Sequence, residues 1–267
     1  MKENLKILIK EKSDKGVLRL IMNNLDQRNA LSESMMSILM DEIKGASSDQ
    51  SIKVIVLAAK GNVFCSGHDL KEITAARENE DSGEVYFKDL FDSCSSLMQL
   101  IVNTPQPVIA EVDGVATAAG CQLVASCDLA IASNESKFAT PGVNIGLFCS
   151  TPMVALSRNV NKKNAMEMLL TGDFINAEKA KEIGLINNMV QKEELTFEVS
   201  KLAEKIASKS SMTVSIGKKA FYAQAEMDLS KAYKYTSKTM KDNLLNHDAK
   251  EGINAFIEKR SPVWKEE

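Results

Sequence analysis

The sequence has few of the residues that bind metals or form disulfide frameworks. Its 267 residues include two histidines, His68 and His247, which are too widely separated in sequence to suggest a metal cluster. The five cysteines contain no CxxC pair and form no even framework, so reduced thiols are expected, as in the cytosol. The sequence therefore predicts neither a metal site nor a disulfide scaffold.

An excess of charge and a long apolar run are also missing from the sequence. The 33 basic residues nearly balance 36 acidic ones, which argues against a nucleic-acid partner, because such binding needs a concentrated basic face. The N-terminus, MKENLKILIKEK, alternates apolar and polar residues and lacks an apolar signal core. No uncharged apolar run approaches a membrane span. We therefore expect a cytoplasmic protein with neither a nucleic-acid nor a membrane partner.

Predicted strands and helices alternate in the first half of the chain. Apolar patterning predicts strands over 5–10, 17–22, 52–59, 107–114 and 127–133, and helical periodicity starts at Ser32. Strands linked by crossovers indicate an α/β protein with a largely parallel sheet. After residue 148 helical segments follow one another, so we predict an α/β core over 1–200 and a helical C-terminal part over 201–267.

Two turns rich in small residues follow predicted strands. They are GNVFCSGHDLKE (61–72) and TAAGCQLVAS (117–126), and helical residues resume after each. A helix start leaves backbone N–H groups unpaired, so two such turns facing one pocket would place two donors on one oxygen, as an oxyanion hole does. Taken alone, a glycine turn between strand and helix is more often a plain connection. Neither turn has a phosphate-binding signature, so no nucleotide cofactor is predicted.

Together with their surroundings, these turns resemble the crotonase (enoyl-CoA hydratase/isomerase) superfamily. Six stretches in the family's order carry the resemblance: QRNAL (27–31), FCSGHDLKE (64–72), PVIAEVDGVATAAGCQLVASCDLAIAS (107–133), FATPGVNIGL (138–147), TGDFINAEKAKEIGLIN (171–187) and AFIEKRSPVW (255–264). The resemblance covers essentially the whole chain. It implies the crotonase fold, with mostly parallel sheets, covering helices and a helical C-terminal trimerisation part. It also implies a homotrimer or a dimer of trimers.

The resemblance also implies an acyl-CoA site. The backbone amides of His68 and Ala119 would hold the thioester oxygen, and coenzyme A, as part of the substrate, would leave no separate cofactor. The positions that resemble substrate or CoA contacts are Arg28, Ala30, Leu31, Ser66, Asp69, Leu70, Gly120 and Gly142. At the C-terminus, Phe256 and Lys259 match positions that often reach the CoA of a neighbouring subunit.

The sequence departs from the family at both catalytic carboxylates. The two glutamates of the hydratases are replaced by Gln122 and Gly142, and a glutamine cannot take up a proton. Cys149 becomes a candidate, because its loop is expected to line the acyl pocket. The default interpretation of Cys121 and Cys127 is core packing. The His68 ring is interpreted as polar packing, Asp69 as a helix cap, and Glu72 and Glu111 as solvated or paired side chains.

Four functions stay open at this point. One is an enoyl-CoA hydratase or isomerase. Another is an acyl-CoA decarboxylase, in which loss of carbon dioxide forms the enolate without a strong base. The SGHD turn (66–69) resembles that of methylmalonyl-CoA decarboxylase, although Cys149 replaces the expected tyrosine. A thioesterase and a non-catalytic acyl-CoA-binding oligomer complete the set. The sequence favours an acyl-CoA-binding enzyme that works through a thioester enolate.

Overall fold

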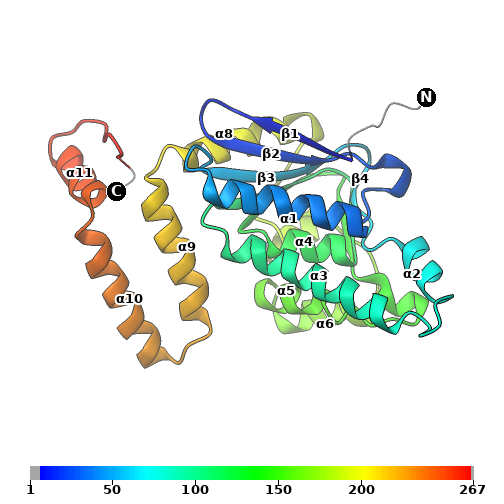
Figure 1. Ribbon diagram of the computed structural model, residues 1–267. Coiled ribbons are helices and arrows are strands. Elements are labelled where there is room, and N and C mark those ends of the chain that lie inside the picture. Colours follow the sequence, from blue (N-terminus) through cyan, green and yellow to red (C-terminus); the bar gives the residue numbers. More distant parts are fainter. Residues whose placement is uncertain (1–6, 266–267) are drawn as a thin grey trace.

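The computed structural model describes residues 7–265 and contains two β-sheets covered by helices (Figure 1). The larger sheet has the order β1-β2-β3-β5-β7-β10, and its strands are β1 (Leu8–Lys12), β2 (Val17–Met22), β3 (Val54–Ala59), β5 (Val108–Val112), β7 (Leu129–Ser133) and β10 (Asn188–Val190). The β1–β2 pair is antiparallel and every other pair is parallel. The predicted α/β class with a largely parallel sheet is confirmed.

A second sheet of four short strands was not predicted from the sequence. Its order is β4-β6-β8-β9, with β4 (Val63–Cys65), β6 (Val115–Thr117), β8 (Lys137–Ala139) and β9 (Ile175–Asn176). Strands of two or three residues are too short to show an alternating pattern. This small sheet positions the candidate site, because β4 and β6 each lead into one of the two glycine-containing turns.

The helices cover both faces of the larger sheet. They are α1 (Glu33–Ser48), α2 (Leu70–Ala76), α3 (Glu84–Asn103), α4 (Ala119–Ser126), α5 (Pro152–Asn159), α6 (Lys162–Thr171), α7 (Ala177–Glu182), α8 (Leu195–Ala207), α9 (Ser211–Ala225), α10 (Leu229–Leu244) and α11 (His247–Ile257), with short 3-10 turns η1 (Leu25–Gln27), η2 (Pro141–Ile145) and η3 (Lys192–Glu194). Buried residues of α1, α3 and α4 pack with strand residues in the main core, and α8 packs on the opposite face of the sheet. Because both faces are covered, the central strand β3 is apolar along its length, as its sequence predicted.

Local sequence signals set several helix boundaries. Ser32 caps α1 by accepting a hydrogen bond from the Met35 amide, and Asn176 caps α7 in the same way through the Lys179 amide. Gly172 ends α6 with a left-handed backbone. The start of α1 agrees with the helical periodicity predicted from Ser32. The strand predicted at 5–10 falls partly outside the described residues, and β1 begins at Leu8.

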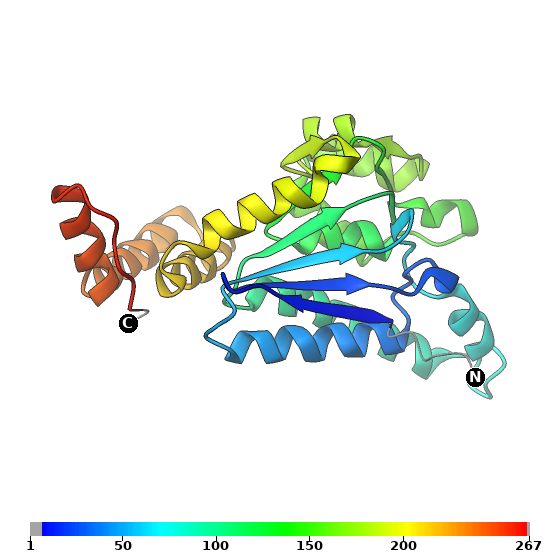
Figure 2. The same cartoon turned by 90° about the horizontal axis from the view of Figure 1, so that it is seen from above.

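The last three helices, α9 to α11, extend away from the two sheets (Figures 1 and 2). The proposed boundary between core and C-terminal part at residue 200 stays a prediction. Within residues 7–265, no helix combines the length and apolar character needed to cross a membrane. The same residues contain no group of three His, Cys, Asp or Glu side chains that could hold a metal ion.

Lys218 attaches α9 to the core through a partly buried polar cluster. Its ammonium donates to the carbonyl oxygens of Ile101 and Gln106 at 2.9 Å each, and it lies 2.7 Å from an Asp128 carboxylate oxygen. The Lys218 side chain is 6% exposed, so water cannot replace these bonds if the ammonium is removed. Tyr222, one turn further along α9, donates to the second Asp128 oxygen at 2.9 Å.

We expect Lys218→Met to destabilise the protein by about 3 kcal/mol, because it leaves the largely buried Asp128 carboxylate without its cation. Urea unfolding followed by circular dichroism measures the change. Lys219→Met, at the neighbouring exposed position, is the matched control and should have little effect. Equal unfolding midpoints for the two variants would contradict this role of Lys218.

Candidate active site

The two turns lie in direct contact with each other. Strands β4 and β6 are parallel neighbours, so the chain leaves both of them at the same edge of the small sheet. The Thr117 hydroxyl donates to the Ser66 carbonyl at 3.1 Å. A Cβ atom added to Gly67 would lie 3.0 Å from the Ala118 Cβ and 3.5 Å from the Ala119 nitrogen. The structure thus brings together two segments that are about fifty residues apart in the sequence.

Unusual backbone conformations occur at both turns. Gly67 has φ +94°, and Ala118 has φ 50° and ψ −118°, a combination that a non-glycine residue rarely adopts. Such strained residues concentrate at functional sites. Ala118 is the N-cap of α4, so the N–H of Ala119, the first helical residue, has no acceptor within the helix. At the other turn, the Gly67 carbonyl accepts from the Leu31 amide at 2.7 Å, which fixes the backbone beside His68.

Gly120 lets helix α4 pack directly against the end of β4. A Cβ atom at this position would lie 2.2 Å from the Cys65 carbonyl oxygen, so any larger residue would push the turn apart. All eight residues of α4 are buried, Cys121 among them, as its core interpretation predicted. The small residues of the TAAG segment are therefore explained by close packing of two turns and a helix.

The Gln122 side chain projects from α4 toward α3. Gln122 is 4% exposed, and its Oε1 accepts from the Cys94 thiol at 3.8 Å. Burial raises the pKa of Cys94 to about 12, so the thiol keeps its proton and is a donor at neutral pH. The sequence reasoning did not identify Cys94, although the apolar periodicity of 84–103 places it on the buried face of that helix.

Gly142 lies in η2, where the space for a side chain is already filled. A Cβ atom there would lie 2.4 Å from the Leu147 carbonyl oxygen and 2.9 Å from the Cys149 sulfur. Burial raises the pKa of the Cys149 thiol, while a hydrogen bond from the Gly142 backbone acts in the opposite direction. The net rise disfavours a thiolate. Cys149 thus occupies the space beside Gly142 as a neutral thiol.

The predicted CoA-contact positions divide into buried and exposed groups. Ala30 and Leu31 are 3% and 0% exposed, and the Ser66 amide donates to the Arg28 carbonyl at 3.2 Å. These contacts hold the segment before α1 against the Gly67 turn. Leu70, at the start of α2, is instead 54% exposed.

Carboxylates near the turns have structural partners. Asp69 caps α2, accepting from the Lys71 amide at 2.8 Å, as predicted. Glu72 accepts from the Tyr86 hydroxyl at 3.3 Å. Glu111 forms an ion pair with Arg19 at 2.7 Å on the face of the sheet that α8 covers.

The C-terminal candidates do not join this site within one chain. Phe256 on α11 is 85% exposed, and α11 lies far from both turns in two views (Figures 1 and 2). Lys259, two residues beyond the helix, has a left-handed backbone with φ 55°. Any contribution of Phe256 and Lys259 to a CoA site therefore requires another subunit.

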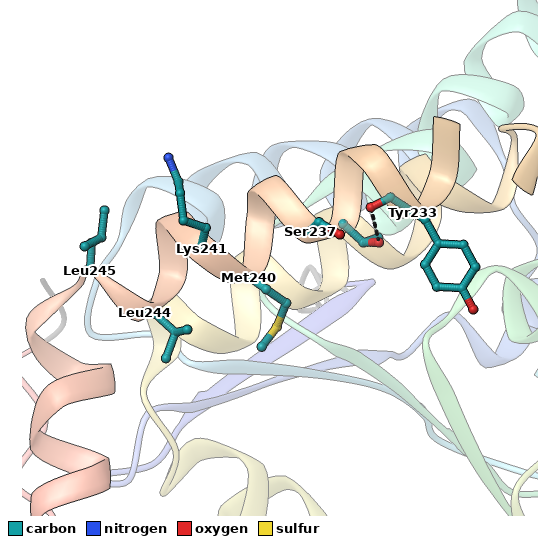
Figure 3. Close-up of a pocket in the computed structure, with 7 residues that line it drawn as sticks. Tyr233, Ser237, Met240, Lys241, Leu244 and Leu245 are labelled. Atoms are coloured by element: carbon teal, nitrogen blue, oxygen red, sulfur yellow. Dashed lines mark hydrogen bonds between the residues drawn. The ribbon is translucent and has the colours of Figure 1, made fainter. Parts of the chain in front are cut away.

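A hollow of about 730 Å³ lies on α10, away from both turns (Figure 3). Its lining comes from this one helix and the residue after it: Tyr233, Thr236, Ser237, Met240, Lys241, Leu244 and Leu245. In Figure 3 the side chains of Tyr233, Met240 and Leu244 project to one side of the helix. A hollow lined by one helix is an uncovered face, and we do not place catalysis there.

Two mostly parallel sheets, their covering helices and the helical C-terminal region define a protein with the crotonase fold. The model of the enoyl-CoA hydratase/isomerase family matches residues 12–267. A crystal structure of an enoyl-CoA hydratase from Mycobacterium smegmatis superimposes with a TM-score of 0.92 at 46% identity, covering 97% of this chain and 98% of that one. The chain belongs to the enoyl-CoA hydratase/isomerase family.

Two further relatives indicate which type of family member this chain resembles. The mitochondrial enoyl-CoA hydratase domain-containing protein 3 of Rattus norvegicus is 51% identical over 249 residues, covering 93% of this chain and 81% of that one. The crystal structure of human enoyl-CoA hydratase domain-containing protein 3 has a TM-score of 0.92 at 49% identity, covering 97% of this chain and 100% of that one. The patterns ATAAGCQLVASCD (116–128) and FATPGVNIGLFCSTP (138–152) look closest to the same type, which these relatives confirm.

The expectation of a cytoplasmic location is wrong. The rat relative is named as a mitochondrial protein, and four further vertebrate relatives at 48–51% identity carry the same name. The expectation rested on the absence of an apolar signal core and on reduced cysteines. Neither feature distinguishes the cytosol from the mitochondrial interior, where a protein can also lack an apolar leader.

Proposed function

We propose that this chain binds acyl-CoA thioesters and stabilises the enolate form of the thioester. The carbonyl oxygen of the thioester lies between the backbone amides of His68 and Ala119. The hydrogen bonds from both amides strengthen as negative charge develops on this oxygen. The observation that carries the proposal is the contact of the Gly67 turn with the strained start of α4. Relatives named as hydratases support the substrate class.

Gln122 and Gly142 set this chain apart from hydratases with two carboxylates. The proposed reaction therefore depends on the oxyanion hole more than on water activation. Enolate chemistry at C2 of the acyl chain is the activity we assign. Hydration of a double bond is at most a weak accompanying reaction.

A pair of CoA derivatives tests the oxyanion hole directly. Butyryl-CoA carries the thioester oxygen, whereas S-butyl-CoA is a thioether of nearly the same length without it. Each net hydrogen bond contributes about 1 kcal/mol. We therefore expect calorimetric titration to show at least about tenfold weaker binding of the thioether. Equal affinity for the two compounds would argue against the proposed position of the oxygen.

We further propose that the chain forms a homotrimer or a dimer of trimers through its C-terminal helices. The α10 face carries Tyr233 and Met240, which are 68% and 60% exposed, and Phe256 on α11 is more exposed still. Apolar residues grouped in this way mark a protein interface. Assembly would bring Phe256 and Lys259 toward a neighbouring subunit's CoA.

The double variant Tyr233→Glu/Met240→Glu is expected to reduce the mass in sedimentation equilibrium to that of one chain, because it places charges in the interface. Phe197→Glu on α8, at a residue that is 67% exposed, is the matched control and should keep the parent mass. A parent chain that is already monomeric at micromolar concentration would contradict the assembly.

A further inference from the structure

The imidazole of His68 has a fixed tautomer and one nitrogen without a partner. Its Nδ1 lies 3.3 Å from the Leu31 carbonyl oxygen. A carbonyl oxygen can only accept, so Nδ1 carries the hydrogen and Nε2 presents a lone pair. Nε2 is buried and has no hydrogen-bond partner among residues 7–265. Burial also lowers the pKa of His68, so the ring is neutral at physiological pH. A buried acceptor left unpaired by the protein is suited to a proton from a ligand.

Helix α3 contacts both this ring and Gln122. The ring meets Phe91 edge to face, with centroids 5.6 Å apart, and Gln122 meets Cys94. Phe91 and Cys94 are three residues apart on α3, so they are neighbours on one face of the helix. The imidazole and the Gln122 amide therefore lie against adjoining turns of the same helix. Gln122 occupies one of the two positions where hydratases carry a catalytic glutamate.

The two side chains have opposite hydrogen-bonding roles. The Gln122 oxygen is engaged by the Cys94 thiol, which leaves the amide N–H groups as donors. His68 Nε2 is an acceptor. Among the side chains around these turns, the neutral imidazole is therefore the group equipped to remove a proton. Cys149 keeps its own proton because burial raises its pKa, and Asp69 is engaged in capping α2. The Glu72 carboxylate already accepts from the Tyr86 hydroxyl and the Glu33 amide.

We propose that His68 is the general base of this site and that its Nε2 removes a proton from C2 of the bound acyl chain. This step rests on the proposed function, which places the thioester oxygen at the His68 amide. The C2–H bond breaks, and its electron pair forms the C1–C2 double bond. The carbonyl π pair moves onto oxygen, and the proton forms the Nε2–H bond of an imidazolium ion. Positive and negative charge arise together, so each offsets the cost of burying the other.

The proposal defines a substrate class: acyl-CoA thioesters with at least one hydrogen on C2. One residue supplies both an oxyanion donor and the base. The base therefore lies within a side chain's length of the thioester oxygen, as proton transfer requires. No water has to be activated in this step.

Exchange of the C2 protons for deuterium tests the base without assuming a later reaction. The full chain is incubated with butyryl-CoA in D2O, and deuterium at C2 is followed by mass spectrometry. His68→Asn keeps an N–H group that can reach the Leu31 carbonyl but removes Nε2, so exchange should fall by about 100-fold or more. His247→Asn changes the other histidine, on α11, and should keep the parent rate.

Binding of butyryl-CoA to the same variants separates this inference from the proposed function. The His68→Asn variant should still bind, because the backbone amide remains. A parent chain that binds without exchanging C2 protons would overturn the base and leave the binding site intact. A His68→Asn variant that exchanges C2 protons as fast as the parent would also overturn the role of His68 as the base and leave the binding site intact. Failure of the parent to bind any thioester would overturn both proposals.

A second variant covers the case in which His68→Asn does not fold. His68→Ala leaves a space for free imidazole. Recovery of C2 exchange on adding imidazole to this variant would support a base at Nε2. A folded, thioester-binding His68→Ala protein that free imidazole fails to restore would count against it.

Discussion

Replacing Gly67 with alanine is expected to lower acyl-CoA turnover by about a hundred- to a thousandfold, the effect of losing one oxyanion donor. Gly67 has φ +94°, a conformation that alanine rarely adopts. The new methyl group would also lie 3.0 Å from the Ala118 Cβ and 3.3 Å from the Thr117 carbonyl. Relief of either strain moves the His68 amide away from Ala119. Turnover of a thioester panel, or C2 exchange, measures the loss.

Gly184→Ala is the matched control for this experiment. Gly184 has φ +85°, and its added methyl group would lie 3.3 Å from the Asn159 carbonyl, so strain and crowding resemble those at Gly67. Both variants should therefore lose similar stability, about 1 kcal/mol or more. Activity should fall in the Gly67 variant alone. Equal activities in two equally stable variants would mean that the Gly67 turn takes no part in the reaction.

Sequence patterns could predict the elements whose signals are local. The apolar run at 52–59 predicted a strand, and Ser32 predicted the start of a helix. The small sheet was missed because its strands are too short to show a period. Its absence from the prediction matters, since the pairing of β4 with β6 is what brings the two turns together.

The candidate site was predictable to the level of the backbone but not of the side chains. Glycine and alanine in the two turns indicated close backbone approach. The contact of Cys94 with Gln122 joins residues 28 positions apart, and no period or motif encodes such a contact. The contact of the His68 ring with Phe91 could not be predicted from the sequence for the same reason, because Phe91 lies on another element. The ring was therefore interpreted as packing alone, whereas the structure also leaves its Nε2 unpaired.

Crotonyl-CoA hydration by the parent chain is expected to be slow or absent. A well-placed general acid or base contributes about a hundred- to ten-thousandfold in rate. On the proposed correspondence, Gln122 and Gly142 occupy the two glutamate positions, and neither residue can exchange a proton through its side chain. Binding should survive, because the proposed oxyanion donors are backbone amides. Loss of the enoyl-thioester absorbance measures hydration, and titration measures binding of the same compound. A rate comparable to that of a two-glutamate hydratase would show that the acid–base residues lie elsewhere.

Restoring both carboxylates is expected to fail, for a reason that lies in packing and not in backbone angles. Gly142 has no left-handed φ, so glutamate could adopt its conformation. The obstacle is the Leu147 carbonyl, 2.4 Å from the position of a new Cβ, with the Cys149 sulfur at 2.9 Å. Cys149→Ala removes the sulfur but leaves the carbonyl, so Gly142→Glu must displace the loop in either background. Gln122→Glu alone should fold, since the two side chains have nearly the same shape.

The order of hydration activities among three variants tests whether packing around Gly142 excludes the second carboxylate. We expect hydration by Gln122→Glu/Gly142→Glu to be no faster than by Gln122→Glu, and we expect Cys149→Ala to add nothing to the double variant. Thermal unfolding should show the double variant to be the least stable of the glutamate variants, because the Leu147 carbonyl and the glutamate side chain at position 142 compete for one space. A double variant that hydrates crotonyl-CoA at least a hundred times faster than Gln122→Glu would mean that the loop relaxes around the introduced glutamate side chain at little cost. The second carboxylate would then be missing only because residue 142 is a glycine. The packing of the loop from Gly142 to Cys149 would not exclude it.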